Sequence, residues 1–179
     1  MILLYTGAKV YNVAQNSYLK SLGGYISSTV VPNNNLANLF SDVSLLGMQN
    51  GVIETRAIAL KNITGSTVNN VYLYHTYPVT DAKAKIEWAP ITIPNSQSIE
   101  EINSASSQPY NVSAWYEPVG VSNKILIANS IPNNGVLGLW VRRTLVSPDP
   151  ANAIPANQLE SYLAGLSKTE SIQVSIDYT

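Results

Sequence analysis

The sequence predicts an all-β protein: an antiparallel β-sandwich of about seven to nine strands, in a Greek-key arrangement that is Ig-like or jelly-roll-like, with one minor helix. Three observations predict this class. Turn-forming Gly, Pro and Asn residues recur about every ten to fifteen residues. The runs between them are short and rich in Val, Ile, Tyr and Thr. Several of these runs alternate apolar and polar residues, as half-buried strands do.

The strands are predicted from this alternation and from the turns that bound it. In chain order they are part of 3–13, then 25–31, 53–62, 68–76, a run around 84–88, a run around 125–127, then 136–145 and 172–178. The last has the clearest period of two, because Ile172, Val174 and Ile176 alternate with polar residues. Trp88 falls on the apolar face of its strand, which predicts a core position.

One predicted strand is apolar on both faces. Val71 and Leu73 point away from Tyr72 and Tyr74 in the strand 68–76. Such a strand is either central in a sheet or part of a contact surface. The turn before it, Asn-Ile-Thr-Gly-Ser-Thr, has the residues that a tight reversal needs, so the strands 53–62 and 68–76 are predicted to form an antiparallel hairpin.

Helix is scarce in this sequence. Residues 157–166 place leucine and tyrosine at helical spacing over two to three turns, and 36–40 can form a single turn. Two long irregular segments remain, 95–119 and 147–156, and loops of such length are usually functional.

Length and composition indicate one domain over residues 1–179. The chain has 179 residues, with 45% hydrophobic and only 12% charged residues, against about 25% charged in an average globular domain. A surface that is polar but uncharged suits extended contact with other subunits, because few ionic groups must be desolvated. The alternative is a neutral β-rich domain with nothing docked on it.

Several classes of function find no support in the charge and in the residue types. The net charge is −1 and no basic stripe exists, so no nucleic-acid partner is expected. Arg142 and Arg143 are adjacent on a strand and point to opposite faces, which disfavours a phosphate clamp. No cysteine is present, so neither disulfides nor thiolate metal sites can form. No signal peptide and no long apolar run is recognised, so no membrane partner is expected and synthesis in a cytoplasm is predicted.

Catalytic chemistry is not indicated. His75 is the single histidine, and a catalytic base or a metal site needs further groups around it. A strand-end histidine with a local hydrogen bond is the favoured interpretation. Glu100 and Glu101 are adjacent in a polar loop, whereas a glycosidase needs two carboxylates that face each other across a sugar. We therefore predict no enzyme activity, no cofactor and no metal.

Aromatic residues of the long loop are the predicted binding residues. Tyr110, Trp115 and Tyr116 lie within 95–119, and aromatics are enriched at the centres of interfaces. A protein neighbour is the favoured ligand, with a stacked sugar as the alternative. Residues 1–13 are predicted as a possible N-terminal arm that makes a second contact. Deletion of residues 97–111 is expected to leave the fold intact and to remove assembly.

Two segments resemble a domain of tailed-bacteriophage virion proteins. The first is Glu-Thr-Arg-Ala-Ile-Ala-Leu-Lys-Asn at 54–62 followed by a hydrophobic strand, and the second is Leu-Gly-Leu-Trp-Val-Arg-Arg-Thr at 137–144. The chain departs from that pattern in 95–119 and in 157–166. The resemblance implies a β-sandwich structural protein of capsid-decoration, neck or tail accessory type, located in the virion. It also implies virion proteins as partners, a homo-oligomer or multi-copy assembly, and no catalytic residues. The alternative function is a carbohydrate-binding module, a host-glycan adhesin on the same particle.

Overall fold

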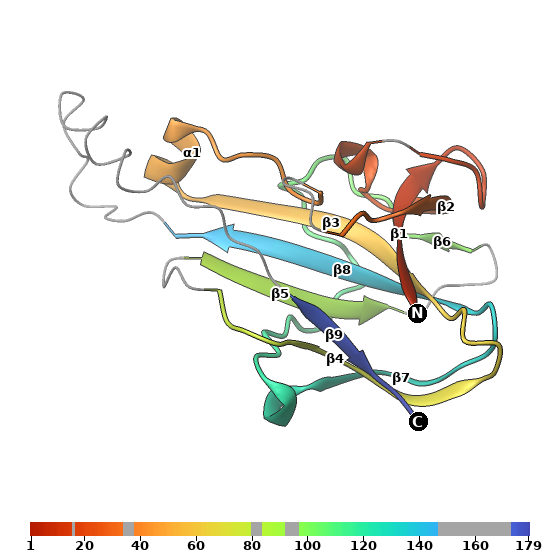
Figure 1. The fold of residues 1–179 in the computed structure, drawn as a ribbon. Helices are drawn as coiled ribbons and strands as arrows, with labels where there is room; N and C mark the ends of the chain where they lie inside the picture. Colours follow the sequence, from red (N-terminus) through yellow and green to blue (C-terminus); the bar gives the residue numbers. More distant parts are fainter. Residues whose placement is uncertain (16, 34–37, 80–83, 92–96, 147–172) are drawn as a thin grey trace.

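The computed structural model describes residues 1–15, 17–33, 38–79, 84–91, 97–146 and 173–179, which form two packed antiparallel sheets (Figure 1). The larger sheet has the strand order β5-β8-β3-β1-β2-β6, and the smaller sheet has the order β7-β4-β9. The strands are β1 Ile2–Ala8, β2 Gly24–Val30, β3 Val52–Lys61, β4 Val68–His75, β5 Ala84–Ile91, β6 Ser98–Ile99, β7 Ile125–Ile131, β8 Val136–Leu145 and β9 Val174–Asp177. The prediction of an all-β sandwich is confirmed.

The main core lies between the two sheets. Alternate residues of most strands point into it, as the period-two pattern predicted, whereas β2 and β6 contribute none. Its buried members are Tyr5, Val31, Ile58, Leu60, Val68, Val71, Leu73, Ile86, Trp88, Ile127, Ile131, Leu139 and Val141. The prediction that Trp88 is a core residue is therefore confirmed.

Helical structure is sparse in the described residues. One short α-helix, α1 Leu45–Asn50, begins at Ser44, whose hydroxyl accepts a hydrogen bond from the backbone N–H of Gly47 (3.1 Å). Two 3₁₀ turns occur at η1 Tyr18–Lys20 and η2 Val121–Asn123. The single turn predicted over 36–40 is wrong for 38–40, which are not helical, and 36–37 lie outside the described residues. The helix predicted over 157–166 and the segment 147–156 also lie outside them.

The predicted hairpin of the third and fourth strands is wrong. β3 pairs with β8 and β1 in the larger sheet, whereas β4 pairs with β7 and β9 in the smaller one. The turn after β3 therefore carries the chain across the sandwich. The turn from β7 to β8 crosses back beside it, and Asn62 joins the two turns, since its N–H donates to the Gly135 carbonyl (2.9 Å) and its carbonyl accepts from Asn134 N–H (2.9 Å).

The side chain of Asn62 is the hub of these crossing turns. It is fully buried. Its Nδ2 donates to the carbonyls of Ser66 (2.7 Å), Ile131 (2.9 Å) and Pro132 (3.1 Å), and its Oδ1 accepts from the N–H (3.0 Å) and hydroxyl (2.8 Å) of Thr64. A buried amide with every hydrogen-bonding group engaged fixes the path of both turns.

The N-terminal segment is not a free arm for most of its length. Residues 2–8 form β1, which lies between β3 and β2 inside the larger sheet, and Leu4, Tyr5 and Thr6 are buried. The prediction of an arm over 1–13 is therefore wrong for β1. The following residues run along the outer edge of β2, where Asn12 N–H donates to the Ile26 carbonyl (2.8 Å) and Val13 accepts from Ser28 N–H (3.2 Å). They cover an edge that would otherwise expose unpaired backbone groups.

Candidate functional site

The long loop predicted as a contact element covers the larger sheet. Within its described part, 97–119, Ile99 and Ile102 are buried against Trp140 on the outer face of that sheet. The backbone joins the sheet at both ends, because β6 pairs with β2 and Tyr116 exchanges two backbone hydrogen bonds with Trp88 (2.8 and 2.9 Å). The expectation that residues 97–111 can be deleted from an intact fold is therefore contradicted, since the deletion exposes this second apolar layer.

The three aromatic residues predicted for binding have different surroundings. Trp115 is half-buried, packs against the Trp140 layer and lies under the guanidinium of Arg142, 4.2 Å from the ring centre. Tyr116 is 44% exposed and Tyr110 is 91% exposed. Trp115 therefore has an internal packing role, while Tyr110 and Tyr116 stay available to a neighbour.

Replacing Trp115 by alanine is expected to destabilise the fold by about 2–3 kcal/mol, because the apolar layer under the loop and the cation–π contact with Arg142 are lost. The matched change Tyr110→Ala is expected to stay within about 0.5 kcal/mol of the wild type, since that ring is on the surface. Urea denaturation of both variants measures the difference. Equal effects of the two changes would contradict the internal role of Trp115.

The arginine doublet is divided between the two faces of β8, as predicted. Arg142 pairs with Glu87 (2.8 Å) on the outer face. Arg143 contacts Glu54 and lies over the ring of Phe40, 5.0 Å from its centre, on the inner face. The two guanidinium groups therefore belong to separate ion pairs and do not converge on one anion.

His75 is part of the core. It is fully buried, and its Nε2 accepts a hydrogen bond from Nε1 of Trp88 (2.5 Å). No described residue pairs with its Nδ1. Burial without a counter-charge lowers the pKa of His75 from 6.5 to about 4. The interpretation of a locally bonded histidine is confirmed, and among the described residues no acid is paired with this neutral side chain.

The two acidic residues of the loop have different surroundings. The Glu100 carboxylate accepts hydrogen bonds from the backbone N–H groups of Tyr110 (2.6 Å) and Asn111 (3.0 Å), so it shapes the loop. Glu101 is exposed at a surface hollow. Among the described residues, no three His, Cys, Asp or Glu side chains gather as a metal site would need.

The outer face of the smaller sheet is the candidate contact surface. The register pairs Tyr72 with Leu126 of β7 on one side and with Asp177 of β9 on the other, and it pairs Tyr74 with Ser175. We call these five residues the tyrosine face. The neighbouring residues Val71, Leu73, Ile127, Val174 and Ile176 point the other way, into the core. The three apolar clusters of the described residues lie between the sheets or on the larger sheet, so none of them covers the tyrosine face.

One ion pair neutralises the charge at this face. Lys124 Nζ lies 3.2 Å from a carboxylate oxygen of Asp177 and 4.5 Å above the centre of the Tyr72 ring. Leu126 beside them is 46% exposed. A surface with tyrosine, leucine and an internally paired charge is inexpensive to desolvate, which is a property of protein interfaces. The alternation in residues 71–74 was the sequence signal for this surface.

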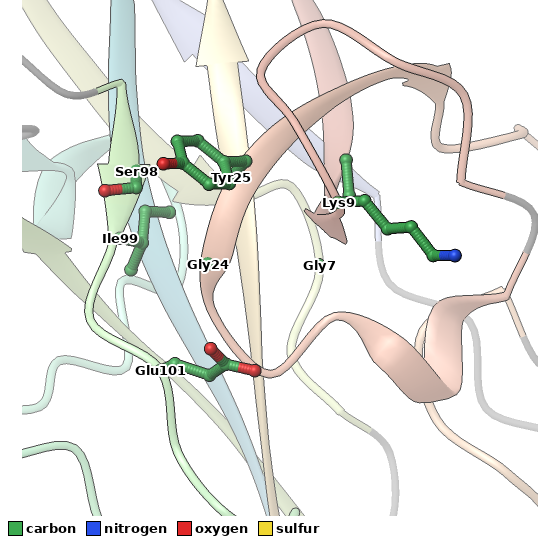
Figure 2. A pocket seen from close by; sticks show the side chains of 8 residues that line it. Gly7, Lys9, Gly24, Tyr25, Ser98, Ile99 and Glu101 are labelled. Atoms are coloured by element: carbon green, nitrogen blue, oxygen red, sulfur yellow. The ribbon is translucent and has the colours of Figure 1, made fainter.

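A second feature is a surface hollow of about 500 Å³ at the edge of the larger sheet. It is lined by the ends of β1, β2 and β6. Figure 2 shows Tyr25 beside Ser98 on one side and Glu101 on the other, with the bare backbone of Gly24 between them. Lys9 extends away from Glu101. The hollow thus offers one aromatic ring, one carboxylate and an open floor of backbone.

Comparisons of the chain with protein-family models, with curated proteins and with solved structures find no match. Within the described ranges, no helix is long and apolar enough to span a membrane.

Proposed function

We propose that this protein is a non-enzymatic structural component of a bacteriophage virion, which binds neighbouring capsid, neck or tail subunits. The observation that carries the proposal is the tyrosine face. The larger sheet is covered on both sides, by the core and by the loop layer, whereas this face of the smaller sheet has no apolar cover within the described residues. The resemblance of residues 54–62 and 137–144 to virion proteins supports the same class.

The energetics fit a repeated assembly. Tyrosine supplies a large contact area with little loss of side-chain freedom, and a few such residues dominate many interfaces. Modest affinity at each contact is sufficient, because copies held in one particle raise the effective concentration of their neighbours. The low charge of the chain, 12% of residues, limits the ionic desolvation that each contact requires.

The test is incorporation of a face variant into particles. The double change Tyr74→Thr with Leu126→Thr keeps strand-forming residues and removes the apolar contact area. We expect at least a tenfold drop in the copies per purified particle, with an unchanged circular dichroism spectrum. The matched variant Leu19→Thr removes an exposed apolar residue elsewhere and is expected to assemble normally. Wild-type incorporation of the double variant would refute the role of this face.

The hollow favours a second candidate function, carbohydrate binding by a host-glycan adhesin. A sugar ring can stack on Tyr25 while its hydroxyls bond to Glu101 and to the backbone at Gly24. Calorimetric titration with maltotriose, chitotriose and lactose tests this candidate. Binding that falls at least tenfold in Tyr25→Ala would support it. The absence of heat with all three sugars, or binding that Tyr25→Ala leaves unchanged, would reject it.

A further inference from the structure

The hollow at the edge of the larger sheet contains a carboxylate without a counter-charge. Glu101 is exposed there. None of the four ion pairs among the described residues includes this side chain. Lys9 also lines the hollow, but its side chain extends away from Glu101 (Figure 2). Within the described part of the chain, the negative charge of the hollow is therefore not neutralised.

The backbone that carries Glu101 is held firmly against β2. Ile99 and Ile102, on either side of it in the sequence, are buried. The N–H of Ile102 donates to the Leu22 carbonyl (2.8 Å). Gly23 permits this close approach, because a Cβ at that position would lie 1.7 Å from the carbonyl oxygen of the residue before Glu101. The carboxylate is thus presented from a fixed backbone, as a binding group should be.

Tyr25 forms the opposite wall of the hollow. Its ring is 40% exposed, and the three cation–π contacts among the described residues involve other rings. Between Tyr25 and Glu101 lies Gly24, whose φ of 73° favours glycine (Figure 2). A Cβ on Gly24 would lie 3.9 Å from a carboxylate oxygen of Glu101. The bare backbone therefore leaves an open space between an aromatic ring and a carboxylate.

We propose that this hollow binds the ammonium or guanidinium group of a lysine or arginine side chain from a neighbouring subunit. A cation in this space forms an ion pair with Glu101 and a cation–π contact with Tyr25 at the same time. A neutral sugar stacks on the same ring, but it leaves the charge of the carboxylate unbalanced. The inference rests on the proposed function only for the source of the cation. The hollow then makes a contact separate from that of the tyrosine face, which lies on the smaller sheet.

Titration of the full chain with short basic peptides tests the hollow. The probes are acetyl-Gly-Arg-Gly-amide and acetyl-Gly-Lys-Gly-amide at low salt, and the neutral control is acetyl-Gly-Gln-Gly-amide. Backbone amide shifts of the isotope-labelled protein report the affinity and the place of binding. We expect millimolar binding of both basic peptides, with the largest shifts at Gly24, Tyr25 and Glu101. The glutamine peptide is expected to bind at least about fivefold more weakly, since it lacks the charge.

The variant Glu101→Gln keeps the shape of the exposed side chain and removes its charge. We expect it to weaken binding of the basic peptides about fivefold or more. The matched variant Glu117→Gln removes the same charge from another exposed position of the chain and is expected to bind as the wild type does.

Three results would overturn the inference. They are the absence of binding by the basic peptides, equal binding of the glutamine peptide, and an affinity that Glu101→Gln leaves unchanged. Tighter binding of a glucosamine trimer than of either basic peptide would also overturn it, because the cation would then belong to an amino sugar. The particle-incorporation experiment uses residues of the tyrosine face, so failure of the hollow is distinguishable from failure of the proposed function.

Discussion

Replacing Asn62 by alanine is expected to destabilise the protein by about 3–4 kcal/mol, one of the largest effects of any single change. The carboxamide makes five hydrogen bonds, three of them to carbonyls of two different turns. Each hydrogen bond contributes about 1 kcal/mol, and a buried carbonyl left without a donor adds a desolvation penalty. Both crossings between the sheets lose their common anchor, so we expect a cooperative loss of stability in urea denaturation.

The matched control for this change is Asn133→Ala, in the crossing turn between β7 and β8. Its side chain is exposed, so we expect a change below about 0.5 kcal/mol. An Asn62→Ala variant as stable as Asn133→Ala would show that the backbone alone holds the two turns. It would contradict the role of the Asn62 side chain as their common anchor.

Acid is expected to weaken the fold through His75. In the unfolded chain this group takes up a proton near its ordinary pKa of 6.5, whereas in the folded protein it does so only at about 4. Between these values the unfolded state binds more protons, so the stability falls as the pH is lowered from about 6.5 to 4 and is unaffected above that window. The loss amounts to about 3 kcal/mol, at roughly 1.4 kcal/mol for each unit of pKa difference.

The variant His75→Gln isolates this contribution from that of the carboxylates. Its side-chain oxygen can accept the hydrogen bond from Trp88, but it does not titrate. Denaturation followed by tryptophan fluorescence between pH 7 and 4 gives both stability profiles. We expect the advantage of the wild type over the variant to shrink as the pH falls. Parallel profiles would mean that His75 has the same pKa in the folded and unfolded protein, and would contradict its burial as a neutral group.

The sequence predicted the strands well because their signals are local. The strand 136–145 was predicted with its observed limits, and those at 53–62 and 68–76 differ by one residue at their ends from β3 and β4. The pairing of β3 and β4 could not be predicted in the same way. Asn and Gly permit a reversal of the chain, but the same residues serve a hairpin and a crossing between sheets. Whether a hairpin or a crossing forms depends on β7 and β8, which lie far along the sequence. The turn between these two strands hydrogen-bonds to Asn62.

The candidate site was predicted in part. The alternation of Val71 and Leu73 with Tyr72 and Tyr74 indicated a strand with two apolar faces, and the structure places the tyrosines on the outer one. The ion pair of Lys124 with Asp177 joins residues of two other segments, so no local pattern reveals it. The role of Trp115 was missed because the apolar residues of its loop are widely spaced and show no period. The positions of these apolar residues are explained by the fold, in which they pack on the outer face of the larger sheet.

Quantitative mass spectrometry of purified particles tests the central claim most directly. The proposed function requires a phage that encodes this chain, and the particles of that phage are separated on a density gradient from free protein. A structural building block is expected to remain with the particles, at a constant ratio to the major capsid protein in every peak fraction and in multiple copies. A chain found in the soluble lysate and missing from intact particles would contradict the proposed function.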